Sequence, residues 1–176
     1  MTRAAVTAML VATLGGGVAA CSHGDEPEHK GTDVDISDPQ QADPGVIAQS
    51  VTRVLLSWDP AKQESPFDVP AEVKKQTGGK LAQMLESPSR EDVKRWKPEE
   101  WESWAIGNVQ MKGFADTPTT SGDGAKRTVR MNVVQRLNYP DGTRSTWLTS
   151  EATAKVEQHG NTWIVTSLTV KKKPQQ

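Results

Sequence analysis

The chain has 176 residues, of which 35% are hydrophobic and 24% are charged, and its formal net charge is −1. This length accommodates one ordinary domain with a leader and a tail, and the composition excludes a protein that crosses a membrane several times. A net charge close to zero gives no indication of nucleic-acid binding. The single cysteine, Cys21, excludes an intramolecular disulfide and a metal site built from several cysteines.

Residues 1–20 have the pattern of a secretory signal peptide. Arg3 provides a short basic start, an apolar stretch continues to Leu14, and three consecutive glycines follow it. Because the stretch is short and rich in small residues, we do not expect it to remain in the membrane as a permanent span.

The end of this leader resembles the lipobox of bacterial lipoprotein signals. That motif has a branched aliphatic residue, two small residues and a cysteine, and Val18, Ala19, Ala20 and Cys21 match it position for position. The resemblance implies that a type II signal peptidase recognises the first three residues and cleaves before a lipid-modified Cys21. Two acyl chains would then hold the protein at the extracytoplasmic face of the cell membrane. The alternative is an ordinary secretory signal with an incidental cysteine.

Residues 21–43 are predicted to form a disordered acidic tether. Seven acids and one base lie between residues 21 and 45, whereas residues 46–176 carry nineteen bases and fifteen acids. The tether has no apolar periodicity, so it cannot bury enough surface to offset the entropy of ordering. His23 and His29 stand among its carboxylates, but we interpret this group as a solvated linker and predict no bound metal or other cofactor.

The next part of the sequence indicates helices. Apolar residues recur at helical spacing from 44 to 58, after an Asp-Pro pair that suits a helix start. A second helical region is predicted from 70 to 86, where two adjacent glycines weaken or split the helix. The segment from 90 to 103 is polar, contains tryptophans and is expected to hold a short helix.

After about residue 103 the apolar period changes to two, which is typical of strands. The predicted strands cover residues 104–111, 128–138, 147–157 and 162–170. A loop is predicted from 117 to 124, and residues 171–176 are expected to be a basic tail. Helices followed by strands indicate an α+β domain over residues 44–170, with N-terminal helices packed on a curved antiparallel sheet of about four strands.

This element order resembles the NTF2-like cone fold, and in detail the VirB8-type and TcpC-type conjugation proteins. Leu56–Pro60 follows the first helix, Trp101 and Trp104 open the sheet, and Gly160–Val165 matches a Gly-x-x-Trp turn and strand. The resemblance covers residues 44–170 and implies a cone-shaped domain that serves a conjugation or secretion apparatus. We expect the two tryptophans to be buried at the junction of helix and sheet.

The residue types used in catalysis are poorly placed for an enzyme. Two of the three histidines belong to the tether, and the third, His159, belongs to a turn. No Ser-His-Asp, paired-carboxylate or phosphate-loop pattern occurs, and Asp116, Asp123 and Asp141 are interpreted as turn formers. We therefore predict no catalytic residue. A hydrolase or isomerase would need a buried polar residue inside the cone.

The best candidates for a partner patch are Trp96, Lys94 and Arg95, because an aromatic side chain among cations is typical of a protein-binding surface. Trp96 is the single residue that we expect to be an exposed anchor. Arg130 and Arg136 share one strand face and are candidates for the same basic patch. A solvated sheet face is the alternative for these two arginines.

These observations favour a lipid-anchored, non-catalytic cell-envelope protein that acts as an interaction module, as an accessory of a conjugation or secretion apparatus. Its partners would be the membrane, through lipid on Cys21, and an envelope protein. No nucleic-acid partner is expected, and the sequence leaves open whether the protein forms a homo-oligomer. The alternative is a lipoprotein that binds a small molecule or lipid in the cone. An open apolar cavity would favour the alternative, and a cone filled by Trp58, Trp104 and Trp163 would favour the module.

Overall fold

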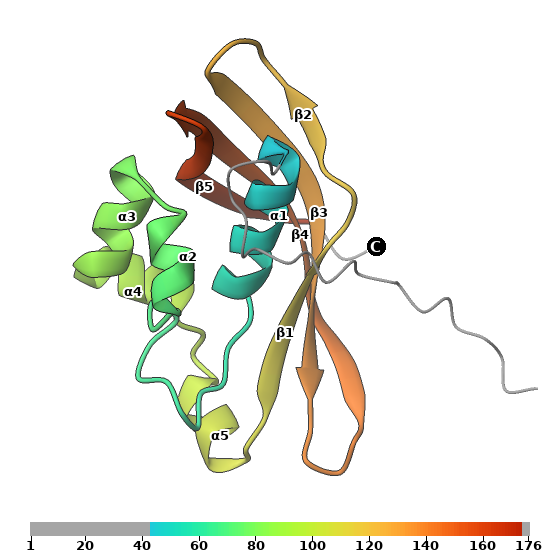
Figure 1. Cartoon of the computed structure of the whole chain (residues 1–176). Coiled ribbons are helices and arrows are strands. Elements are labelled where there is room, and N and C mark those ends of the chain that lie inside the picture. The colour runs from blue at the N-terminus through green and yellow to red at the C-terminus, as the bar shows by residue number, and fades with distance from the viewer. Residues whose placement is uncertain (1–42, 174–176) are drawn as a thin grey trace, which may run out of the picture. The chain divides into compact units, whose positions relative to one another are not determined.

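A computed structural model describes residues 43–173, in which five helices precede five strands (Figure 1). The helices are α1 (Pro44–Leu55), α2 (Ala71–Lys75), α3 (Gly79–Glu86), α4 (Arg90–Trp96) and α5 (Trp101–Ile106). The strands are β1 (Gln110–Ala115), β2 (Thr119–Ser121), β3 (Lys126–Asn138), β4 (Arg144–His159) and β5 (Thr162–Lys172). The predicted leader, Cys21 and the tether up to residue 42 lie outside the described residues.

The strands form one antiparallel sheet in the order β1-β3-β4-β5, and the short β2 pairs with β3. The long hairpin of β3 and β4 is its centre, and the pairing register shifts at Gln135/Arg136 and, between β4 and β5, at Lys155/Val156. Such bulges increase the twist and bend of a strand. The sheet curls so far that α1 packs against all five strands, and the helices lie on one side of it (Figure 1). The predicted α+β architecture is confirmed.

The core lies between α1 and the curled sheet. Helix α1 begins at an N-cap, where the carboxylate of Asp43 accepts a hydrogen bond from the N–H of Gly45 at 2.7 Å. The buried face of α1 consists of Ile47, Ala48, Val51 and Leu55. The apolar strand residues that alternate toward it include Val129, Met131, Val133, Ala152, Ala154 and Val156. The alanines of β4 leave room for the helix to approach the sheet closely.

Four tryptophans, two of which belong to α5, fill one end of the domain. The ring centroid of Trp58 lies 5.8 Å from that of Trp101 and 6.2 Å from that of Trp147, and Trp104 meets Trp147 edge-on at 5.3 Å. Trp101 is 2% exposed and Trp104 is 7% exposed, which confirms their predicted burial. The indole N–H of Trp58 donates to the carbonyl of Leu55 at 2.9 Å, so the cluster leaves this polar group satisfied.

The strand predicted over residues 104–111 is wrong in its first half. Residues Trp101–Ile106 form α5, and β1 begins only at Gln110. Trp101 and Trp104 are three residues apart, so a helix puts both indoles on its buried face, whereas Ile106 points to solvent and is 85% exposed. The apolar residues of this short segment fit the period of a strand as well as that of a helix. The helix forms because it buries both indoles on one face.

Other boundaries also differ from the predicted ones. Helix α1 ends at Leu55 instead of residue 58, because the backbone of Trp58 pairs with Met111 of β1. The helical region 70–86 is split at the glycine pair, as the sequence allowed, into α2 and α3, and the backbone between them pairs with Val165 of β5. Strand β5 extends through Lys172, two residues into the predicted tail, and β2 lies within the predicted loop 117–124.

Candidate interaction groove

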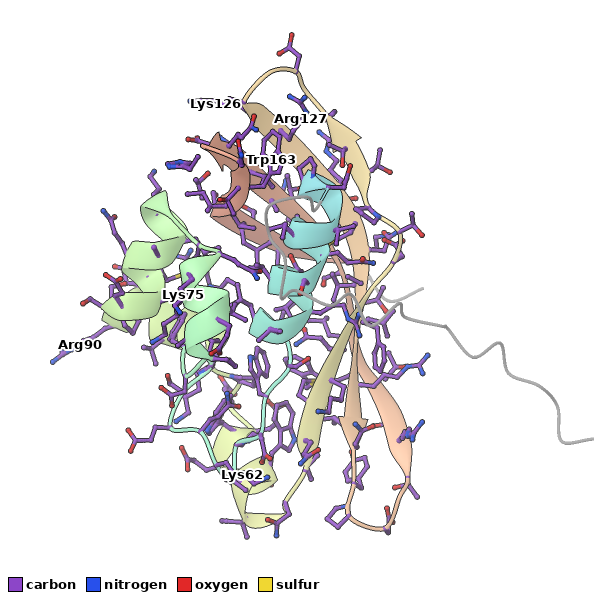
Figure 2. All side chains as sticks on the ribbon, viewed as in Figure 1. Lys62, Lys75, Arg90, Lys126, Arg127 and Trp163 are labelled. Carbon is purple, nitrogen blue, oxygen red and sulfur yellow. The ribbon has the colours of Figure 1, made fainter. Side chains whose placement is uncertain are left out.

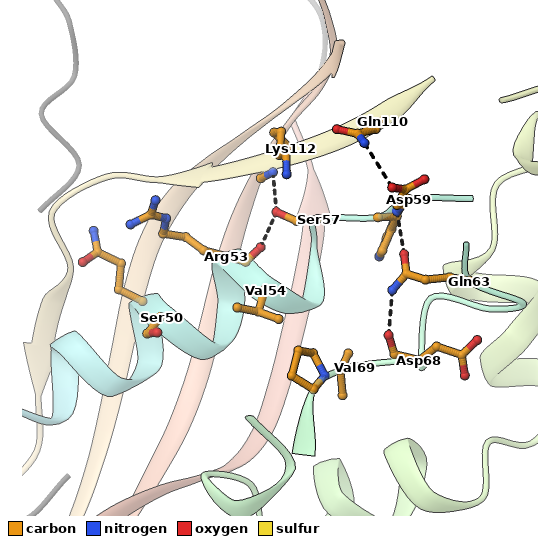
Figure 3. Close-up of a pocket in the computed structure, with 14 residues that line it drawn as sticks. Ser50, Arg53, Val54, Ser57, Asp59, Gln63, Asp68, Val69, Gln110 and Lys112 are labelled. Carbon is orange, nitrogen blue, oxygen red and sulfur yellow. Dashed lines mark hydrogen bonds between the residues drawn. The ribbon is translucent and has the colours of Figure 1, made fainter. Parts of the chain in front are cut away.

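A pocket of about 480 Å³ opens beside α1 on the outside of the core (Figure 3). We call it the groove. Its three sides are the C-terminal half of α1, the loop between residues 59 and 70, and strand β1. The residues that line it are Gln49, Ser50, Arg53, Val54, Ser57, Trp58, Asp59, Gln63, Asp68, Val69, Pro70, Gln110, Lys112 and Gly113. The side chains that give the groove its chemistry therefore come from segments that lie far apart in the sequence.

The wall formed by the loop is held by a chain of hydrogen bonds (Figure 3). The amide of Gln110 donates to the carboxylate of Asp59 at 3.0 Å, and the backbone N–H of Asp59 donates to Gln63 at 2.5 Å. Gln63 in turn donates to the backbone carbonyl of Asp68 at 2.6 Å. These bonds tie the loop to β1 and to itself, so that this wall is preorganised.

The back of the groove is a tight junction between the end of α1 and β1. The hydroxyl of Ser57 donates to the carbonyl of Arg53 at 2.7 Å and accepts from the N–H of Gly113 at 2.9 Å. A Cβ atom on Gly113 would lie 2.9 Å from the carbonyl oxygen of Leu56, closer than real Cβ atoms approach backbone. Glycine is therefore required here by the close approach of the chain.

The acidic and basic side chains of the groove differ in the partners that they have within the domain. The Asp59 carboxylate accepts from Lys62 at 2.9 Å as well as from Gln110, and the Asp68 carboxylate accepts two backbone N–H groups at 2.8 and 3.0 Å. Among residues 43–173, the cations with a carboxylate within 4.0 Å are Lys62, Arg95, Lys97 and Lys126. Arg53 and Lys112 are not among them, so the uncommitted charge of the groove is positive.

The carboxyl groups with displaced pKa values lie outside the groove, at a helix start and in a turn. Hydrogen bonds from Ser89 lower the pKa of Asp92, which completes the capping box of α4. Hydrogen bonds from the side chain and backbone of Thr143 lower the pKa of Asp141. The latter pair confirms the interpretation of Asp141 as a turn former. Within residues 43–173, no cluster of three or more metal-binding side chains occurs.

Tryptophans close the cone at one end only. Trp58 and Trp104 are buried there, but Trp163 lies at the other end, half-buried beneath the guanidinium of Arg127 at 5.5 Å (Figure 2).

Three buried side-chain oxygens in the described part of the chain have no hydrogen-bond partner, those of Thr52, Gln76 and Ser150. A hydroxyl or amide oxygen does not serve as a general base at neutral pH.

The candidate partner patch is divided between two surfaces. Trp96 is half-buried, because it packs on the core with its ring 6.1 Å from that of buried Phe67, so it is less exposed than the sequence indicated. Lys94 and Arg95 are exposed beside it on α4. Arg130 and Arg136 alternate with the buried residues of β3, so they point to the sheet face away from the helices. They therefore cannot share one patch with α4.

Sequence reasoning did not find the groove. Residues such as Gln49 and Gln110 are ordinary polar residues on a helix and a strand, and nothing in their local pattern marks them. The one available signal was the small cluster of turn-forming residues between 59 and 70, which indicated a loop without indicating what it faces.

No protein-family model matches the chain, and no curated protein does either. Among solved structures, an IcmL-like type IV secretion system protein from Legionella pneumophila is similar with a TM-score of 0.54 and 13% identity, over 75% of this chain and 92% of that one. A Catenulispora acidiphila protein in complex with S-DNPA is similar with a TM-score of 0.43 and 14% identity, over 72% of this chain and 91% of that one.

An NTF2-like protein with a cystatin-like fold from Novosphingobium aromaticivorans is similar with a TM-score of 0.39 and 10% identity, over 72% of this chain and 73% of that one. At these identities the likeness concerns the fold alone. Helices laid on one side of a curled antiparallel sheet are the α+β, NTF2-like cone predicted from the sequence.

Proposed function

We propose that this protein is a non-catalytic, lipid-tethered interaction module of the cell envelope, and an accessory of a secretion or conjugation apparatus. The observation that carries this proposal is the groove, a preorganised surface site with uncommitted positive charge next to a domain end that is packed with tryptophans. Such a site suits the side chains of a protein partner, because complementary charge at an interface guides docking and fixes orientation.

The chemistry of the groove supports a binding role over catalysis. Its nucleophile candidates are the hydroxyls of Ser50 and Ser57. Ser57 already donates to one backbone group and accepts from another, and no histidine among residues 43–173 lines the groove to activate either serine. Asp59 and Asp68 hold the loop through their hydrogen bonds, so we assign them a structural role.

The similarity in fold to a type IV secretion system protein makes a secretion apparatus the first envelope assembly to examine. Recruitment would work through the membrane. Lipid on Cys21 would confine the domain to a thin layer, and confinement raises its effective concentration for a partner in the same layer. The acidic tether would keep the domain off an anionic bilayer.

The test is chemical crosslinking in intact cells, followed by identification of what co-purifies with the protein, with Cys21→Ala as the control. We expect a defined set of envelope-apparatus proteins that disappears in the control. Recovery of no protein partner from the anchored form would refute the interaction-module proposal.

The size of the groove favours a second candidate function, binding of a small molecule. A volume of about 480 Å³ falls within the range of ligand pockets, and Val54, Val69 and Pro70 give it apolar surface. This candidate predicts that a metabolite or lipid remains bound through purification and is seen by mass spectrometry of the intact protein. Small-molecule binding becomes the favoured function if such a ligand is found and no protein partner is recovered.

A further inference from the structure

We infer that the groove recognises an acidic peptide segment of the partner protein, in which aspartate or glutamate side chains alternate with aliphatic ones. This inference rests on the proposed function and specifies the chemistry of the partner at that site. The carboxylates would meet Arg53 and Lys112, and an aliphatic side chain would lie on Val54, Val69 and Pro70.

The two cations of the groove favour an acidic ligand. Arg53 stands in the last turn of α1 and Lys112 stands on β1, and both line the groove (Figure 3). Neither has a carboxylate within 4.0 Å among residues 43–173. Their positive charges are therefore available to a ligand. A guanidinium pairs with a carboxylate through two parallel hydrogen bonds, which orients the ligand as well as attracting it.

The acids of the groove already have hydrogen-bond donors within the domain, so they do not offer free acceptors to a basic ligand. Asp59 is engaged by Lys62 and Gln110, and Asp68 is engaged by backbone N–H groups of its own loop. Both stand on the wall opposite Arg53 (Figure 3). A basic segment would have to break these bonds, whereas an acidic segment finds its partners unoccupied.

The edge of β1 is closed to the addition of another strand. Its outward backbone groups are used by the protein itself: Met111 pairs with Trp58 at 2.8 and 2.9 Å, and the N–H of Gly113 donates to Ser57. The side chain of Gln49 donates to the carbonyls of Ala115 and Asp116 at 3.0 and 2.7 Å. A segment in the groove must therefore be recognised through its side chains, since the main-chain pairing of an added strand is blocked.

The experiment measures binding of a fluorescent peptide of alternating aspartate and valine, with both ends blocked, to the full chain purified in detergent. Fluorescence anisotropy gives the affinity, and the same peptide with asparagine in place of aspartate is the ligand control. We expect binding of the acidic peptide, little binding of the asparagine peptide, and weakening by added salt, because the contacts are exposed ion pairs.

The protein variant is Arg53→Glu with Lys112→Glu. Its matched control is Lys155→Glu with Lys171→Glu, which changes the net charge by the same amount on exposed residues of the face turned away from the helices. The groove variant should bind at least about tenfold more weakly, and the control should bind within about twofold of the unchanged protein. The neutral pair Arg53→Gln with Lys112→Gln replaces the groove variant if the latter does not fold, as judged by circular dichroism.

Equal weakening of the groove variant and its control would overturn the inference, as would equal binding of the acidic and asparagine peptides. Failure here is distinguishable from failure of the proposed function. If crosslinking finds an envelope partner but the peptide does not bind, the function stands and the assignment of the groove falls. If the peptide binds as expected but no partner is found, the groove is an acidic-peptide site and the envelope role falls.

Discussion

The replacement Gly113→Ala tests the junction that forms the back of the groove. The new Cβ would lie 2.9 Å from the carbonyl oxygen of Leu56 and 3.1 Å from its carbonyl carbon, so the chain after α1 must move away from β1. Overpacking of this kind costs about 1–3 kcal/mol, and the reduced freedom of the unfolded chain returns about 0.4–1 kcal/mol. We expect a net loss of about 1–2 kcal/mol, which corresponds to a fall in Tm of about 5 °C.

The matched control is Gly78→Ala, where the obstruction is of a different kind. Its Cβ would meet the terminal methyl group of Ile164 at 2.5 Å, which is closer than the contact at Gly113. Because a side-chain end can rotate away and a backbone carbonyl cannot, we expect Gly78→Ala to change stability by less than about 0.5 kcal/mol, with Ile164→Val relieving any loss. Urea unfolding followed by tryptophan fluorescence measures both. The reasoning is refuted if Gly78→Ala is the more damaging of the two.

Three further substitutions probe the fold. Trp58→Phe removes the hydrogen bond to Leu55 and leaves a void among the indoles, so we expect a loss of about 2–4 kcal/mol in urea unfolding. Asp43→Ala removes the cap of α1 and should cost about 0.5–2 kcal/mol by the same assay. Ser89→Ala removes the hydroxyl hydrogen bond, which contributes most to the lowered pKa of Asp92, and leaves the hydrogen bond from the backbone N–H of residue 89. Because that stabilisation is present above the unfolded pKa and is lost as pH falls through the folded one, the mutant should differ from the unchanged protein more at pH 7 than at pH 3.

The parts of the fold that could be predicted are those with a strong local pattern. The stripe of Ile47, Val51 and Leu55 after an Asp-Pro pair indicates α1, and the turn of Tyr139–Gly142 between two alternating segments indicates the hairpin of β3 and β4. In each case the local pattern and the final packing agree, because one face of the element is buried and the other is not.

The segment around α5 was misassigned for a physical reason. Its apolar residues suit a short strand and a short helix equally, and only the burial of Trp101 and Trp104 against Trp58 and Trp147 separates the two. That burial depends on residues about 40 positions away in either direction. The same holds for Trp96, because helices α2 and α3 lie between it and its contact Phe67 in the sequence.

The groove depends even more on contacts between distant residues. Its junction joins Ser57 to Gly113, and its wall joins Asp59 to Gln110. The sequence shows these residues as one serine, one glycine, one acid and one amide, with no spacing that links them. That Arg53 and Lys112 have no carboxylate within 4.0 Å among residues 43–173 becomes visible only in the structure.

Site-specific photocrosslinking in intact cells tests the central claim most directly. A photoreactive residue replaces Ser50, which lines the groove, or Lys155, which lies exposed on the sheet face away from the helices. Each is placed in the chain with Cys21 and in the Cys21→Ala variant. The account predicts an adduct with one defined envelope protein from position 50, none from position 155, and loss of the adduct without Cys21. No adduct from position 50, or the same adduct from both positions, would contradict a membrane-recruited module that binds through its groove.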